Sequence, residues 1–176
     1  MDKSRELMKR VPIENIFKYW DEHLKQSPDE IFVSQKYLYF VQPFLMENIM
    51  LPDSVPLTLY ERQTLYHLGC FTVQVMMREY PSITQVTQRD MEAISKRIRP
   101  ESGLRIGAKD PYRFLKWMDH MLSRHNQRDL LTFLWERLVG LNEDNLEELR
   151  NENAVLIFTY LKIIVEALDS ASLAYN

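Results

Sequence analysis

His67 and Cys70 are reactive residue types that lie three positions apart in a predicted helix, so their side chains share a face. An imidazole and a thiol at this spacing could bind one metal ion or act as a base and nucleophile pair. A metal site needs three or four ligands, and the sequence has no second Cys or His pair at helical spacing. The alternative interpretation is a small buried thiol and a core histidine that finds one hydrogen-bond partner.

Asp119, His120 and His125 form a second group, in which a carboxylate beside imidazoles could transfer protons. Adjacent residues of a helix point about 100° apart, so Asp119 and His120 do not face each other. The position of His125 near a predicted helix C-terminus also suits a charge interaction with the helix dipole. The sequence contains no Glu-x-x-His, which removes the di-iron carboxylate site that helical bundles of this size can hold. We therefore assign no catalytic residue, no metal and no cofactor.

The strongest functional pattern is a basic segment between residues 96 and 113. Its bases stand against only two acids, Glu101 and Asp110, and its loop contains Gly103 and Gly107. Loop amides and guanidinium groups could together bind a phosphate or another anion. The glycine spacing matches no phosphate-loop fingerprint, and the loop is too long for a helix-turn-helix. The alternative is a solvated basic surface. The bases are Lys96, Arg97, Arg99, Arg105, Lys109 and Arg113.

The composition predicts one soluble domain covering residues 1–176. The chain has 45% hydrophobic residues, and its net charge of -3 argues against nucleic acid as a partner of the whole surface. Its single cysteine excludes an intrachain disulfide. The N-terminus carries no apolar run typical of a secretion signal, and the apolar tract 154–165 is shorter than the ~20 residues of a membrane span. We expect a cytoplasmic protein without a membrane partner.

Residues 57–80 are predicted to form a central buried helix, because their second half carries only two polar side chains in ten. Thr58 and Glu61 have the spacing of a capping box, and Pro81 ends the helix after Tyr80. The predicted fold is therefore all-α, a bundle of about seven helices packed around this element.

Apolar periodicity and helix-start signals predict the other helices. A helix over 12–26 is followed by an aromatic one that begins at Ser27-Pro28 and is kinked or split at Pro43. One later helix is predicted from Thr87 to Pro100. Another begins at Asp110 and ends at a turn near Asn126. The next is predicted to close at Gly140.

The last helix is predicted from Glu143 to about Ser170, with Asn142 as its cap. Its branched and aromatic residues would also suit a buried strand. Its polar residues favour a helix over a strand, because they recur at intervals of three, four or seven and would form one exposed stripe on a helix. The stripe consists of Glu152, Thr159, Lys162, Glu166 and Asp169.

These patterns together favour a non-catalytic protein-interaction or regulatory protein. Its contact surfaces would be the basic segment 96–113 and any apolar patch that the aromatic second helix leaves open. The expected partner is a protein, and a homodimer would close an unfilled apolar stripe. One alternative is binding of nucleic acid or of an anionic, phosphate-bearing ligand by the same basic segment. Another is a small-ligand sensor or enzyme with an apolar pocket between helices near His67 and Cys70.

Overall fold

A computed structural model describes residues 10–50, 56–101, 111–144 and 151–172. Within these residues the chain forms helices and no strand, which confirms the predicted all-α, multi-helix fold. The eight described helices are α1 (Ile13–Leu24), α2 (Pro28–Val41), α3 (Pro43–Met50), α4 (Leu59–Glu79), α5 (Gln88–Glu101), α6 (Pro111–Arg124), α7 (Arg128–Asp144) and α8 (Asn151–Ser172).

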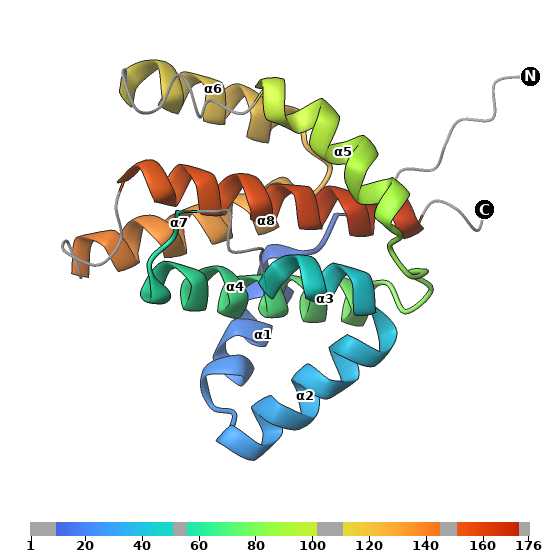
Figure 1. Ribbon diagram of the computed structural model, residues 1–176. Helices are drawn as coiled ribbons and strands as arrows, with labels where there is room; N and C mark the ends of the chain where they lie inside the picture. The colour runs from blue at the N-terminus through green and yellow to red at the C-terminus, as the bar shows by residue number, and fades with distance from the viewer. Residues whose placement is uncertain (1–9, 51–55, 102–110, 145–150, 173–176) are drawn as a thin grey trace, which may run out of the picture.

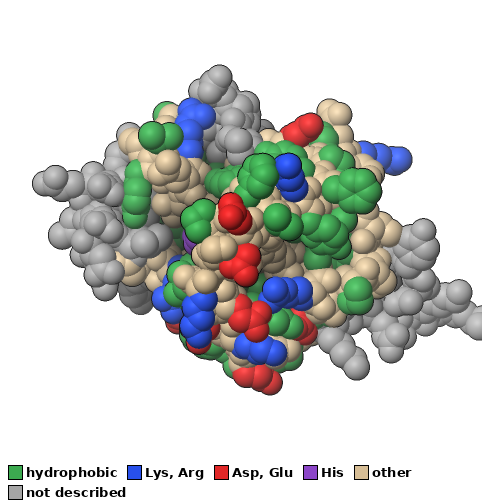
Figure 2. Space-filling view, turned by 90° about the horizontal axis from the view of Figure 1, so that it is seen from below, with side chains coloured by type: hydrophobic (Ala, Val, Ile, Leu, Met, Phe, Trp, Pro, Cys, Tyr) green, Lys and Arg blue, Asp and Glu red, His purple; other side chains and the backbone are tan. Residues whose placement is uncertain are grey.

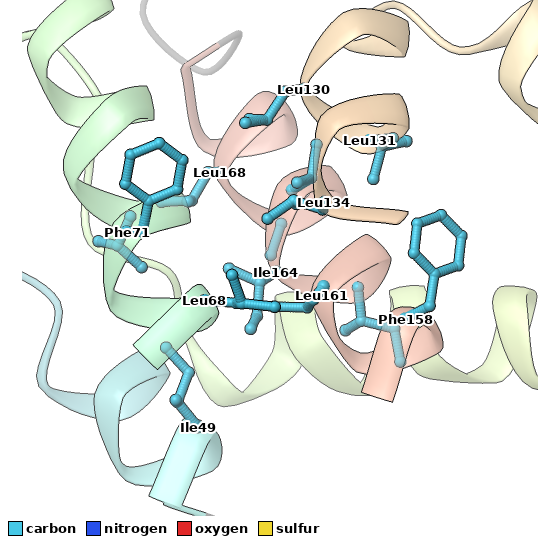
Figure 3. Packing of buried hydrophobic residues seen from close by; sticks show 14 of the residues in the cluster. Ile49, Leu68, Phe71, Leu130, Leu131, Leu134, Phe158, Leu161, Ile164 and Leu168 are labelled. Carbon is cyan, nitrogen blue, oxygen red and sulfur yellow. The ribbon is translucent and has the colours of Figure 1, made fainter. Parts of the chain in front are cut away.

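The helices are stacked in layers (Figure 1). α8 contacts α4, α5 and α7, while α6 lies against α7. α4 also contacts α1, α2 and α3, and α2 lies at the far end of the molecule from α5 and α6. The core forms where α3, α4, α7 and α8 meet (Figure 3). Its labelled side chains are Ile49, Leu68, Phe71, Leu130, Leu131, Leu134, Phe158, Leu161, Ile164 and Leu168, all nearly inaccessible to solvent.

Reciprocal bonds of the capping-box type start α2, α4 and α5, the last through Thr87 and Asp90, and the one at α4 was predicted from Thr58 and Glu61. The Thr58 hydroxyl accepts from the Glu61 backbone amide at 3.2 Å, and the Glu61 carboxylate accepts from the Thr58 amide at 2.7 Å. Ser27 and Glu30 make the same exchange at α2. These caps satisfy amides that the first turn of a helix leaves without partners. Glu61 is fully buried and also accepts from Asn153 at 2.8 Å, which ties the start of α4 to α8.

Pro43 splits the aromatic segment into α2 and α3, as predicted. The residue between the two helices, Gln42, is 1% exposed and fixes the angle between them. Its side-chain amide donates to the Thr84 carbonyl at 2.9 Å and accepts from the Val86 backbone amide at 2.8 Å. The junction between α2 and α3 is therefore hydrogen-bonded to the segment between α4 and α5. These bonds hold α2 in a fixed orientation.

Two predicted helix ends are wrong. α5 continues to Glu101, one residue past Pro100, and α7 continues through Gly140 to Asp144. A glycine inside a helix costs about 1 kcal/mol relative to alanine, which the packing of neighbouring residues can exceed. Asn142 and Glu143 therefore lie inside α7, and α8 begins at Asn151, so the predicted cap and start of the last helix are wrong as well.

The polar stripe predicted to be exposed on α8 is largely covered. Thr159 and Lys162 are each only 4% exposed, and the Glu166 side chain is 11% exposed. α5 and α7 pack on α8 and bury this side of it. The periodicity identified the helix correctly, but the polar residues pair with each other and with neighbouring helices instead of facing water.

Gly69 and Gly140 make a matched pair for testing this packing. A Cβ at Gly69 would lie 2.9 Å from Cγ2 of Ile49, a buried and β-branched residue with little freedom to move, whereas a Cβ at Gly140 would meet nothing within 4 Å. We expect Gly69→Ala to lower the free energy of unfolding by about 1–2 kcal/mol through overpacking. Gly140→Ala should raise it by about 0.5–1 kcal/mol through helix propensity. Urea unfolding of both variants checks this, and stabilisation by Gly69→Ala would contradict the close contact of α3 with α4.

Candidate functional site

Among the described residues, the most exposed apolar surface with a regular pattern lies on α2. Phe32, Val33, Tyr37 and Phe40 are exposed by 56%, 65%, 56% and 81%. At about 100° per residue these positions fall within an arc of about 140°, opposite the buried Leu38. We call these four residues the α2 stripe. Apolar side chains scattered singly over a surface are ordinary, but four on one helix face form a candidate contact surface.

The surroundings of the α2 stripe are charged. Lys36 lies within the same arc, with its ammonium 4.4 Å from the Phe32 ring centre. Asp29 and Glu30 are exposed in the first turn of α2. Figure 2 looks onto this end of the molecule and shows hydrophobic side chains gathered among basic and acidic ones. An apolar centre with a charged rim is the usual organisation of a protein-binding surface.

A groove of about 590 Å³ opens between α1, α4 and α7. Its volume falls in the range of about 300–1,000 Å³ typical of small-molecule sites. We call it the Arg137 groove. The residues that define it are Trp20, Leu24, Tyr60, Tyr66, His67 and Arg137.

His67 borders the Arg137 groove and pairs with a histidine from another helix. His23 of α1 is 7% exposed, and its Nε2 lies 3.2 Å from Nε2 of His67, so one ring donates a proton to the other. Trp20 stacks on His23 with ring centres 5.7 Å apart, and Phe71 lies 5.6 Å away. Burial and then the neighbouring imidazole lower the pKa of His23 to about 4, and loss of hydration also lowers the pKa of His67. The pair is therefore neutral at pH 7.

Protonation of His23 should destabilise the fold in mild acid. The unfolded residue binds a proton near pH 6.5 but the folded one only near pH 4, so between these values the unfolded state binds more protons. We expect the free energy of unfolding to fall by about 2 kcal/mol between about pH 7 and pH 5. His23→Phe, which keeps an aromatic ring between Trp20 and Phe71, should remove most of this fall.

Urea unfolding at both pH values measures this effect, and His120→Phe is the control because His120 is exposed on α6. An equal pH dependence in wild-type protein and His23→Phe would contradict the assignment.

Cys70 does not join His67 in a site. Its side chain is 3% exposed, and burial raises the pKa of the thiol to about 12 despite a hydrogen bond with the Tyr66 hydroxyl. His67 faces His23 instead. The structure thus brings together two histidines that are 44 residues apart, and the sequence analysis named only one of them. The apolar, periodic context of His23 in α1 gave no signal of this pairing.

The basic segment is only partly described. Arg97 forms an ion pair with Glu166 of α8, and Lys96 lines a second groove, between α3, α5 and α8. Arg99 and Arg113 lie in α5 and α6, but the structure does not describe their side chains. Arg105 and Lys109 lie outside the described residues. Anion or partner binding by the whole segment stays a prediction, and one of its guanidinium groups is already bonded within the fold.

Glu166 lies at the centre of a network of bases. Lys162 donates to its Oε1 at 2.5 Å, Arg97 pairs with Oε2, and Nε2 of His125 lies 3.6 Å from Oε1. Nδ1 of His125 accepts from the Gln127 backbone amide at 3.0 Å, so the ring's proton faces Glu166. Burial alone would raise the pKa of Glu166, but the bonds from His125 and Lys162 and the charges of Lys162 and Arg97 lower it to about 2.

The second predicted group of titratable residues separates in space. His125 belongs to the Glu166 network, whereas Asp119 and His120 are exposed on α6. The Glu166 network joins α5, the turn between α6 and α7, and α8, with Glu166 and Lys162 largely buried and Arg97 exposed, and it has the geometry of a structural element. Sequence analysis missed it because Lys162 and Glu166 were assigned to an exposed stripe, Arg97 to the basic segment and His125 to the group with Asp119 and His120.

Comparisons with protein-family models, curated proteins and solved structures found no match to the chain. In the part of the chain that the structure describes, no group of three His, Cys, Asp or Glu side chains converges as a metal site would require. None of the described helices combines the length and the apolar character needed to cross a membrane. Among the described surfaces, the α2 stripe and the Arg137 groove carry the features that support a functional proposal.

Proposed function

We propose that the chain is a non-catalytic protein-interaction protein that docks through the α2 stripe. The observation that carries the proposal is the exposure of Phe32, Val33, Tyr37 and Phe40 on one face of a helix whose opposite face is buried through Leu38. Large side chains at spacings of three and four are the anchors by which helices recognise one another. Aromatic residues also supply much of the binding energy at protein interfaces.

The rigid attachment of α2 supports docking of this surface as a unit. α2 contacts α3 and α4, and Gln42 bonds its end to the segment that precedes α5. At the other end the Ser27 capping box holds the first turn. A preformed surface loses little conformational entropy on binding, so more of the contact energy appears as affinity.

The partner that this surface fits is a second copy of the chain with its α2 antiparallel. A two-fold axis passing between positions 36 and 37 would place the small Val33 against the large Phe40 of the second copy. The same axis would place Lys36 near Tyr37 of that copy. A parallel pair would instead bring together the acids Asp29 and Glu30 of both copies and align the helix dipoles. Shape and charge both favour the antiparallel arrangement.

Site-specific photo-crosslinking tests the proposal without a need to know any other partner. The photoreactive amino acid p-benzoylphenylalanine replaces Tyr37 in one variant and Asp119, an exposed residue of α6 at the other end of the molecule, in a control variant. At concentrations of about 10–100 µM, illumination should crosslink the Tyr37 variant to twice the mass of the chain and leave the Asp119 variant monomeric. Absence of a dimer from the Tyr37 variant, or equal yields from both positions, would contradict docking through α2.

A further inference from the structure

The Arg137 groove lies on a different surface from the α2 stripe and combines apolar walls with one guanidinium group. Its walls come from three helices and are mostly aromatic or aliphatic, with Trp20 and Leu24 from α1 and Tyr60 and Tyr66 from α4. Leu24 is 62% exposed at this groove, so apolar surface there faces solvent. A cleft of about 590 Å³ with such walls offers a flat apolar molecule more contact than an open surface does.

Arg137 supplies the polar feature of the groove. Its Nε is inaccessible to solvent and has no hydrogen-bond partner. Its guanidinium lies over the Phe133 ring at 4.9 Å and over the Trp20 ring at 5.6 Å, which fixes the plane of the group. Among the described residues no acid forms an ion pair with Arg137. A cation held between rings and poorly hydrated gains most from an anion that reaches it.

The other polar residues of the groove do not supply that anion. Glu136 also lines it but is exposed, so water hydrates its carboxylate. His67 is neutral at pH 7 because its pKa is lowered, and it is engaged with His23. The groove therefore combines apolar walls with one oriented cation whose carboxylate partner is missing from the described residues.

We propose that the Arg137 groove binds a small aromatic carboxylate. The aromatic part of the ligand lies against the apolar walls, and its carboxylate accepts hydrogen bonds from the Arg137 guanidinium. The planar, forked guanidinium suits a carboxylate better than a neutral amide, which offers a single acceptor oxygen without charge.

Isothermal titration calorimetry with a matched pair of probes tests the proposal. 1-Naphthaleneacetate has the aromatic body and the carboxylate, and 1-naphthaleneacetamide has the same body without the charge. For the wild-type protein at about pH 7.5 we expect saturable binding of the acid, at least about tenfold tighter than binding of the amide. Arg137→Met keeps the apolar stem and should reduce the preference for the acid to less than about threefold.

Two further variants distinguish the groove from general surface binding. A Cβ at Gly140 meets open space where this residue lines the groove, so Gly140→Leu should fill the groove and abolish binding of both probes. Arg78→Met is the matched control, because Arg78 is exposed, lies over the Tyr19 ring and pairs with Glu22 away from the groove. It should bind both probes as the wild-type protein does. Thermal unfolding of each variant shows that the fold is retained.

Three results would overturn the proposal. They are no saturable binding of the acid to the wild-type protein, equal affinity for acid and amide, or an undiminished preference for the acid in folded Arg137→Met. Loss of the preference in Arg137→Met together with its retention in Arg78→Met would establish the site. A folded Gly140→Leu variant that still binds the acid would place the ligand elsewhere and count against the groove.

Discussion

Glu166→Gln should lower the free energy of unfolding by about 3–5 kcal/mol, a large part of the ~5–15 kcal/mol typical of a domain. The physical reason is Lys162, which is 4% exposed and donates to Glu166 at 2.5 Å. With the carboxylate replaced by a neutral amide, the buried ammonium loses its counter-charge and keeps only one weaker acceptor oxygen in place of two. Arg97 and His125 would lose the same partner.

A double substitution distinguishes the net contribution of the Lys162–Glu166 pair to stability from the cost of leaving one buried charge unpaired. In Lys162→Met/Glu166→Met both charges are replaced by flexible apolar side chains, so we expect most of the lost stability to return. Glu22→Gln is the control for a surface pair, because Glu22 and Arg78 are both about half exposed, and it should cost less than about 1 kcal/mol. Urea unfolding of these variants gives the comparison. A Glu166→Gln effect as small as that of Glu22→Gln would contradict the buried network.

The same carboxylate predicts how the protein responds to strong acid. Its folded pKa of about 2 lies below its ordinary value of 4.5, so its contribution to stability is present above pH 4.5 and is lost as the pH falls toward 2. The contribution of the neutral His23 is lost at higher pH, between 6.5 and about 4. Acid unfolding should therefore proceed in two ranges, of which His23→Phe removes the upper one and Glu166→Gln the lower one.

Phe40→Asp should weaken self-association by at least about 100-fold, equivalent to about 2.7 kcal/mol. Phe40 is 81% exposed, so the free chain should tolerate the change, while in the dimer the new carboxylate would be buried against Val33 of the second copy. Because a two-fold interface contains each residue twice, one substitution removes two contacts and introduces two charges.

Leu59→Asp provides the matched control for this prediction. Leu59 is 73% exposed, a similarly large apolar side chain, but it lies at the first position of α4 rather than on α2. An acid in the first turn of a helix is also favourable to the fold. Size-exclusion chromatography at several concentrations should show Phe40→Asp as a monomer and Leu59→Asp with the elution of the wild-type protein. Equal behaviour of the two variants would contradict a specific role of the α2 stripe.

Local sequence signals predicted the helices well because their causes are local. Thr58 and Glu61 form the expected capping box, and Pro43 splits α2 from α3 as its missing amide requires. The end of α7 was predicted wrongly at Gly140, because the propensity of one residue is weaker than the packing of a whole helix. The aromatic content of α2 pointed to an open apolar patch, but which aromatics face outward depends on where α3 and α4 lie.

The sites were less predictable because they join residues that are far apart in the sequence. Arg97 and Glu166 are 69 residues apart, and neither residue type signals that helix packing will bring the two side chains together. His67 was identified as chemically notable, but its partner is His23 rather than Cys70. Arg137 entered no predicted motif, and its role depends on rings contributed by α1 and α7. Such juxtapositions follow from the tertiary arrangement and not from residue spacing.

Sedimentation velocity of the unmodified chain is the most direct test of docking through α2. Over about 1–100 µM the proposed interface predicts a concentration-dependent shift from the mass of the 21.1 kDa chain to twice that mass. The shift should be absent in Phe40→Asp. A single monomeric species for the wild-type protein throughout this range would contradict self-association through the α2 stripe.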